Sequence, residues 1–196
     1  NIDSLLQFVG YQKLSIENGR LRKADPRMAV DLNSVAKGYS SDLLGMLLEQ
    51  LGYKNFMVEV GGEIVARGRN AGRQPWRVGV DKPIEDNILP GGVLDTVIML
   101  TDKALATSGN YRNYHLGADG RRIVHTINPL TGLSEPTDML SATVVADRCA
   151  IADAYATMFM AMGSVRAIAF ARERREVRVY FIYTGSDGKI QRFTNL

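Results

Sequence analysis

Cysteine and histidine are scarce in this 196-residue sequence. The one cysteine, Cys149, excludes an internal disulfide framework and any C-x-x-C metal or redox motif, so cysteine usage leaves the cellular compartment open. No apolar run approaches the roughly 20 residues of a membrane-spanning helix. The first ten residues, NIDSLLQFVG, lack the basic and apolar regions of a signal peptide. Because the chain opens on an apolar amphipathic segment, we expect an N-terminal portion to be missing.

A large excess of charge of one sign is also absent. The net charge is +3, and the 24 basic residues are interleaved with 21 acidic ones, so no basic stripe suits a nucleic-acid backbone. We therefore expect no nucleic-acid partner. With 45% apolar and 23% charged residues the composition is globular, and the length allows a sizeable core. We predict a single domain over residues 1–196.

Strand patterns outnumber helical ones and mostly arrive in pairs. Helices are predicted over 34–51, 149–163 and 165–174, and residues 3–10 could be a helix end. The predicted strands are 12–16, 20–23, 56–60, 63–67, 76–80, 93–100, 141–146, 177–183 and 189–193, with a hairpin-like pair around Tyr114 and 121–126. This order favours an α+β fold, a largely antiparallel sheet with packed helices, over a doubly wound α/β fold.

A lone carboxylate, Asp153, interrupts the apolar helix predicted over 149–163. The expected buried stripe of that helix is Ile151, Tyr155, Met158, Phe159 and Met162. None of the residues one turn from Asp153 is basic, so it must find a partner elsewhere or carry the cost of desolvation. Thr157 projects from the same face, and two hard oxygen donors suit Mg²⁺. Alternatively, Asp153 bonds a neighbouring loop backbone and Thr157 a carbonyl of its own helix.

The stretch VDLNSVAKGY, residues 30–39, could bind an anion. We predict Asn33 as the N-cap of the helix over 34–51, which leaves the N–H groups of Ser34, Val35 and Ala36 free for a phosphate, with Lys37 adding positive charge. An ordinary capped helix would look the same. No Walker motif occurs in the chain. The buried face expected for this helix is Ala36, Tyr39, Leu43, Leu47 and Leu51.

Two further stretches carry groups suited to binding or catalysis. Gly61 and Gly62 follow the strand over 56–60 and could form a tight turn or a place where backbone approaches a ligand. His125 stands at a strand end before a Pro-Leu-Thr-Gly turn, where it could transfer protons or be structural. Thr107 and Ser108 supply hydroxyls. A hydrolase using Ser108, His125 and an acid is conceivable, although no G-x-S-x-G elbow supports it.

Taken together and in order, these stretches resemble the ApbE family of flavin transferases. The matching motifs are VDLNSVAKGY, VEVGGEI, ATSGNYRNY, H-x-I-[DN]-P-x-T-G and ADAYATMFMAMG. The match runs over nearly all of the chain, most clearly from Asp31 to Gly163, and five motifs in fixed order are highly specific. The resemblance implies an ApbE-like fold related to the T-fold. It also implies an FAD:protein FMN transferase that uses Mg²⁺ to cut the FAD pyrophosphate, attaches FMN through a phosphoester to a threonine of a target protein, and releases AMP.

The resemblance assigns roles to particular residues. Asp153 and Thr157 match Mg²⁺ ligands, with a third oxygen from Ser34, and His125 matches a histidine proposed to deprotonate the acceptor threonine. The positions expected to contact FAD are Asp31, Lys37, Gly61, Gly62, Thr107, Ser108 and Ile127. Ile127 matches a position that lines the flavin or adenine pocket. Asn128 stands where many relatives have Asp.

Partners and location follow from the same resemblance. Targets in the family are flavin-carrying subunits of Rnf- and Nqr-type redox pumps. Relatives are usually longer at the N-terminus, where a lipoprotein signal and part of the flavin-binding wall lie. We therefore expect the C-terminal two thirds of a periplasmic or cell-envelope lipoprotein, with a membrane contact only through the missing anchor. The same residues could instead support an Mg²⁺-dependent FAD pyrophosphatase, or a module that binds FAD without cutting it.

Overall fold

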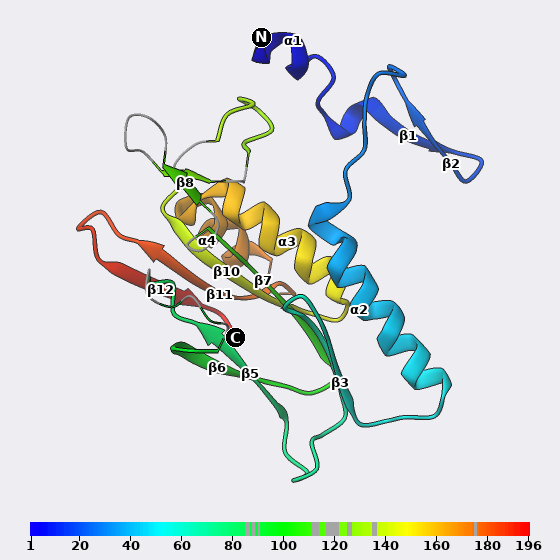
Figure 1. The fold of residues 1–196 in the computed structure, drawn as a ribbon, viewed down its shortest axis with the longest axis vertical. Helices are drawn as coiled ribbons and strands as arrows, with labels where there is room; N and C mark the ends of the chain where they lie inside the picture. Colours follow the sequence, from blue (N-terminus) through cyan, green and yellow to red (C-terminus); the bar gives the residue numbers. More distant parts are fainter. Residues whose placement is uncertain are drawn as a thin grey trace.

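A six-stranded antiparallel sheet forms the centre of the molecule (Figure 1). The computed structural model describes residues 1–84, 87, 89, 91–110, 114–116, 122–124, 127–134, 137–174 and 176–196. The strand order in this sheet is β12-β11-β10-β7-β4-β3, and every neighbouring pair is antiparallel. The strands are β3 (Phe56–Val60), β4 (Glu63–Arg67), β7 (Lys103–Gly109), β10 (Met139–Ala146), β11 (Arg178–Thr184) and β12 (Ile190–Thr194). The predicted α+β class is therefore confirmed.

Three helices cover one face of this sheet. They are α2 (Asn33–Gln50), α3 (Cys149–Met162) and α4 (Ser164–Glu173), each within one residue of its predicted bounds. The core between α3, α4 and the sheet includes Ala152, Phe159 and Ala167 from the helices, packed against Val144 and Phe181 from the strands. Figure 1 shows α2 and α3 side by side above the sheet, so the two helices that carry the predicted metal and phosphate residues are neighbours.

A separate hairpin covers the other face. It consists of β5 (Trp76–Asp81) and β6 (Leu94–Leu100), whose Val80 and Leu100 pack against Leu105 and Ile182 of the main sheet. Asp95 fastens the hairpin. Its Oδ2 accepts hydrogen bonds from the Tyr180 hydroxyl at 2.6 Å and from Arg192 Nε at 2.7 Å. Because these partners belong to β11 and β12, the hairpin is joined to the sheet by side chains and not by a backbone ladder.

The remaining described elements are short. They are α1 (Ile2–Leu6), the 3₁₀ helix η1 (Tyr11–Lys13), the hairpin β1 (Leu14–Glu17) and β2 (Arg20–Lys23), and the pair β8 (Tyr114–Leu116) and β9 (Arg122–Val124). The prediction of a strand from residue 12 was wrong, because η1 occupies the first two positions. In Figure 1 the blue N-terminal segment stands away from the sheet. Among the described residues, no helix combines the length and apolar composition that crossing a membrane requires.

The buried face predicted for α2 was wrong. Tyr39, Leu43, Leu47 and Leu51 are between 47% and 64% exposed. The helix instead buries Gly38, Ser41, Asp42 and Gly45. The physical reason is close approach, because a Cβ atom placed on Gly38 would lie 2.5 Å from the carbonyl oxygen of Cys149. Only small side chains fit such a crossing, so the large apolar ones point outward.

The stripe predicted for α3 was right only in part. Phe159 is fully buried, but Ile151 is 47% exposed. The buried positions also include Cys149, Ala152, Asp153, Ala156 and Met160. Small residues again face the neighbouring helix, while Tyr155, Met158 and Met162 are partly buried against the core and Ile151 alone of the predicted stripe is exposed.

Candidate functional site

The crossing of α2 and α3 is held by two carboxylates that reach across it in opposite directions. Asp153 of α3 accepts a hydrogen bond from the backbone N–H of Gly38 in α2 at 3.0 Å. Asp42 of α2 accepts hydrogen bonds from the N–H groups of Cys149 at 2.8 Å and Ala150 at 3.1 Å. Asp42 therefore caps the start of α3 from another helix, since the local N-cap residue supplies no side-chain bond.

The partner of Asp153 that the sequence analysis left open is therefore the backbone N–H of Gly38. Asp153 is only 3% exposed. Burial raises the pKa of Asp153, while the Gly38 hydrogen bond and the charge of Lys37 act in the opposite direction. Among the described residues, no hydrogen bond reaches its second oxygen, Oδ1. One oxygen is fixed by backbone and the other is available, an arrangement that orients a metal ligand.

The second predicted ligand, Thr157, lies one turn further along α3. Its Oγ1 lies 3.4 Å from Ser108 Oγ on β7. The alternative in which Thr157 bonds back to its own helix is not what the structure shows. Ser108 therefore joins the predicted metal residues through Thr157. The hydrolase alternative stays a prediction, because its base, His125, lies outside the described residues.

Thr107 points the other way, because successive residues of a strand face opposite sides of the sheet. Its Oγ1 lies 2.9 Å from Thr143 Oγ1 on β10. Thr107 also lines a cleft between the main sheet and the β5–β6 hairpin. The two hydroxyls of the ATSGNY motif therefore serve different faces.

The start of α2 differs from the prediction. Leu32 and not Asn33 is the N-cap, and the N–H groups of Val35 and Ala36 already bond the carbonyl of Leu32. Asp31 takes over the capping role, since its Oδ1 accepts from the backbone N–H of Asn33 at 2.7 Å. The anion site built from three free N–H groups is therefore wrong at two of its three positions.

Ser34 lies one helical turn before Gly38, the residue that bonds Asp153. In an α-helix the N–H of one residue faces the carbonyl of the residue four positions earlier, so the Gly38 N–H that bonds Asp153 also faces the Ser34 carbonyl. The Asp153 carboxylate and the Ser34 carbonyl therefore both face the N–H of Gly38. With Thr157 they make a small set of hard oxygens, the kind that Mg²⁺ takes when water and phosphate supply the remaining positions. The residues present thus fit the predicted ion.

Lys37 is held by Glu63, a residue that the sequence analysis did not select. Lys37 Nζ lies 2.7 Å from Glu63 Oε1 and 3.5 Å from the carbonyl oxygen of Gly61. Burial raises the pKa of the Glu63 carboxyl, and the Lys37 ammonium partly offsets that rise. The adjacent Cys149 thiol has its pKa raised to about 12 by burial and then by Asp42, Glu63 and Asp153, so it is no nucleophile near neutral pH.

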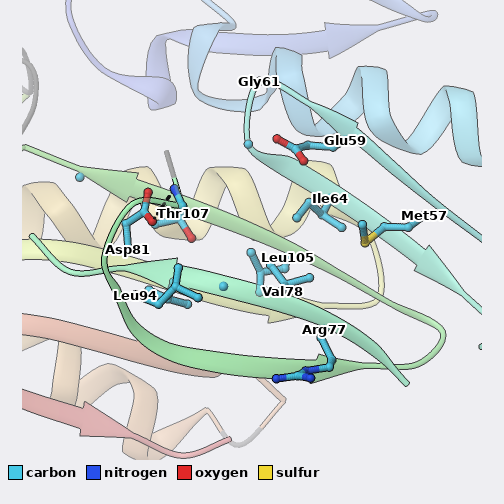
Figure 2. Close-up of a pocket in the computed structure, with 15 residues that line it drawn as sticks. Met57, Glu59, Gly61, Ile64, Arg77, Val78, Asp81, Leu94, Leu105 and Thr107 are labelled. Atoms are coloured by element: carbon cyan, nitrogen blue, oxygen red, sulfur yellow. Dashed lines mark hydrogen bonds between the residues drawn. The ribbon is translucent and has the colours of Figure 1, made fainter. Parts of the chain in front are cut away.

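The predicted glycines shape the turn beside this ion pair. Gly61 and Gly62 have φ angles of 61° and 102°, the left-handed region that glycine adopts without strain. Both line the cleft between the main sheet and the hairpin, which has a volume of about 850 Å³. Figure 2 shows Ile64, Val78 and Leu105 in this cleft, with Glu59 and Gly61 toward one end. The cleft thus has apolar walls, and its polar residues Glu59, Arg77, Asp81 and Thr107 lie at several places around it.

Two predicted residues lie beyond this group. Ile127 is 58% exposed, in a loop where Asn128 Oδ1 accepts from the Leu130 N–H at 2.9 Å. His125, the predicted base, lies outside the described residues. The structure therefore brings together Ser34, Lys37, Ser108, Asp153 and Thr157, with Gly61, Gly62 and Thr107 at the adjoining cleft.

Asp42 and Glu63 are the polar residues that sequence reasoning missed. Glu63 lies in the quoted motif VEVGGEI, whereas Asp42 lies three residues beyond the end of VDLNSVAKGY. In the sequence each is an ordinary carboxylate, and only the structure shows that it is buried. Asp42 has no basic residue three or four positions away, and Glu63 lies on a strand, where helical spacing carries no information.

Solved structures of flavin transferases share this fold. The chain superposes on "Flavin Transferase ApbE from Vibrio cholerae" with a TM-score of 0.85 and 35% identity, covering 98% of this chain and 59% of that one. It superposes on the apo form of the Pseudomonas stutzeri flavinyl transferase ApbE with a TM-score of 0.84 and 32% identity, covering 98% and 57%. The fold of this chain is therefore shared with these solved transferases.

The sequence comparisons agree. The model of the ApbE family matches residues 1–181, and the chain belongs to that family. A Vibrio cholerae protein named FAD:protein FMN transferase is 39% identical over 179 residues, which are 91% of this chain and 52% of that protein. The chain therefore spans about half the length of the curated relatives it matches, less than the two thirds that its motifs had indicated.

Proposed function

We propose that this chain carries the catalytic site of an FAD:protein FMN transferase. The reaction would attach FMN from FAD through a phosphoester to a threonine of a target flavoprotein subunit and release AMP. The observation that supports it is the α2–α3 crossing, where Asp153, Thr157 and Lys37 converge in a chain that belongs to the ApbE family. The relatives named for this activity contain about twice the length of the present chain.

Mg²⁺ is the proposed metal of this site. Asp153 and Thr157 would hold it together with an oxygen of Ser34. When bound, the ion would neutralise negative charge on the pyrophosphate. Lys37 is half exposed beside the Gly61–Gly62 turn and can donate to a phosphate oxygen. Asp31 would act indirectly, because it fixes the first turn of α2 that precedes both Ser34 and Lys37.

His125 is the proposed base. It would take the proton of the acceptor threonine, whose oxygen then bonds to the phosphorus on the FMN side of the pyrophosphate. The bond from that phosphorus to the bridging oxygen breaks, and AMP leaves with that oxygen. Lys37 would hold the phosphates while this bond is exchanged, and Ser108 would orient the Thr157 hydroxyl.

The cleft on the other face of the sheet is a proposed part of the FAD site. Gly61, Gly62 and Thr107 line it, and its apolar walls suit a flat ring system. Ile127 is proposed to contact the flavin or the adenine from its exposed loop.

One experiment separates this function from its alternatives. The protein is incubated with FAD, Mg²⁺ and a threonine-containing acceptor, and the products are followed by mass spectrometry. Transfer predicts an acceptor that gains the mass of FMN, together with AMP. Free FMN and AMP with an unchanged acceptor would identify a pyrophosphatase, and FAD that stays intact would identify a binding module.

The acceptor and the location are proposed on the family resemblance. The acceptor would be a flavin-carrying subunit of an Rnf- or Nqr-type redox pump, and the full-length protein would be a periplasmic or cell-envelope lipoprotein. Fractionation of cells that produce the full-length protein tests the location. Recovery in the cytoplasmic fraction would contradict it.

A further inference from the structure

The lysine of the candidate site is neutralised by a buried carboxylate. Glu63 has 3% of its side chain exposed, whereas Lys37 is 50% exposed. Glu63 Oε1 accepts a hydrogen bond from Lys37 Nζ at 2.7 Å. The other, Oε2, is buried and has no hydrogen-bond partner among the described residues. The Glu63 carboxylate is therefore fixed in the interior, and the Lys37 ammonium lies at the surface.

The surroundings of Glu63 make Lys37 its described counter-charge. Burial is the largest influence on its carboxyl, and Lys37 opposes it by hydrogen bond and by charge. Asp153 of α3 adds a further negative charge nearby, and the Cys149 thiol of α3 is protonated. Ser41 of α2 touches only the backbone of this residue, through the Glu63 carbonyl at 2.8 Å. The charge of Glu63 thus acts mainly on Lys37 and on whatever Lys37 binds.

From this geometry we infer that Glu63 is a positioning residue that holds Lys37 in place. Because its negative charge offsets the charge of Lys37, Glu63 also lowers the affinity of the site for anionic ligands. The inference rests on the proposed function and deepens it, since it concerns how tightly the nucleotide is held. An ammonium has three hydrogens, and the one given to Glu63 leaves others for a phosphate. The same buried carboxylate repels that phosphate, so substrate and AMP bind less tightly than a free lysine would allow.

The two effects of Glu63 on affinity are opposed, and their sizes decide the outcome. Holding Lys37 in place spares part of the side-chain entropy that binding would otherwise cost. Repulsion between a buried carboxylate and a nearby pyrophosphate is the larger effect, because water screens buried charge poorly. We therefore expect Glu63→Gln, which keeps the shape and an acceptor oxygen but removes the charge, to bind FAD about five- to tenfold more tightly.

The experiment measures the affinity of the protein for FAD and for AMP, each with Mg²⁺, in the unsubstituted protein and in Glu63→Gln. Glu49→Gln is the matched control, because this substitution changes the net charge by the same amount. Glu49 lies near the other end of α2 from Lys37 and pairs with Arg67. Glu63→Met serves as a second variant that also removes the unpartnered oxygen. Thermal unfolding of each variant shows whether the fold is retained.

The expected result is tighter binding of both nucleotides in both Glu63 variants, no change in Glu49→Gln, and a gain that shrinks as salt is added. In steady-state kinetics the KM for FAD should fall and AMP should become a stronger product inhibitor. A merely structural role predicts unchanged or weaker binding, and that result would overturn the inference. If the unsubstituted protein binds FAD but makes no FMN adduct, the transferase proposal fails alone. If it binds neither nucleotide, both proposals fail.

Discussion

The Asp153 carboxylate of α3 accepts a hydrogen bond from the Gly38 N–H of α2 at 3.0 Å. This bond fixes one oxygen of a buried acid and orients the other. It also ties the acid to the turn of α2 that carries Ser34 and Lys37. The relative position of the predicted metal and phosphate residues is therefore set by buried carboxylates that bond the backbone of the facing helix.

The first prediction concerns Asp153→Asn. The amide oxygen can still accept from Gly38, so the fold should be retained, but the charge that attracts a divalent cation is lost. We expect Mg²⁺ to strengthen FAD binding in the unsubstituted protein and to have no effect in the variant. Calorimetric titration of FAD with and without Mg²⁺ measures this. An equal Mg²⁺ effect in both proteins would sink the metal assignment.

Gly38→Ala should destabilise the protein strongly. The added Cβ would lie 2.5 Å from the Cys149 carbonyl oxygen and 2.7 Å from its carbon, and both are backbone atoms that cannot move aside. We expect a loss of about 1–3 kcal/mol in the free energy of unfolding, measured by urea denaturation.

Gly45→Ala in the same helix is the control for that experiment. Its Cβ would lie 3.1 Å from Val65 Cγ1, a side-chain atom, and alanine favours the helix. We expect a change within about 1 kcal/mol of zero. If both variants lose the same stability, the backbone contact at Gly38 is not what matters.

The Asp95 anchor predicts a pH dependence of stability. Arg192 and Tyr180 lower the pKa of Asp95 in the folded protein, against the opposing effect of burial. A lowered pKa contributes stability that is present above the unfolded value of about 3.9 and is lost as the pH falls through the folded value. Between about pH 5 and pH 3, thermal stability should therefore fall more steeply in the unsubstituted protein than in Asp95→Asn. Parallel curves would contradict the anchor.

His125→Ala tests the proposed base. It should slow FMN transfer by about 10²- to 10⁴-fold while leaving FAD affinity unchanged, because a base acts on the acceptor hydroxyl and not on FAD. Single-turnover rates and equilibrium titration separate the two quantities. Equal losses in rate and in affinity would make His125 a binding residue.

The sequence predicted the helices and most strands because their apolar patterns are long. It missed β7, the central strand that carries Thr107 and Ser108. Residues 104–109, ALATSG, are mostly small, and small side chains carry little strand preference. Both faces of β7 are covered, by α3 and by the β5–β6 hairpin, so tertiary packing and not local propensity makes this segment a strand.

The candidate site was predictable in its residues but not in its geometry. The motifs singled out Asp153, Thr157 and Lys37. Hydropathy could not show that α2 turns its glycines inward, because periodicity assumes that the largest apolar side chains are buried. The partners of Asp153 and Lys37 are separated from them in sequence by 115 and 26 positions, and such pairings come only from the fold.

The crossing of α2 and α3 also determines which positions can be changed when the protein is redesigned. The carboxylates of Asp42 and Asp153 bond the backbone of Cys149 and Gly38, so these four positions have to be transplanted as one unit. The β5–β6 hairpin meets the sheet through side chains, and its exposed cleft residues Arg77 and Leu94 can be varied individually while Val78 and Val80 are kept as core. A library built to accept altered nucleotides should therefore vary the hairpin and leave the crossing untouched.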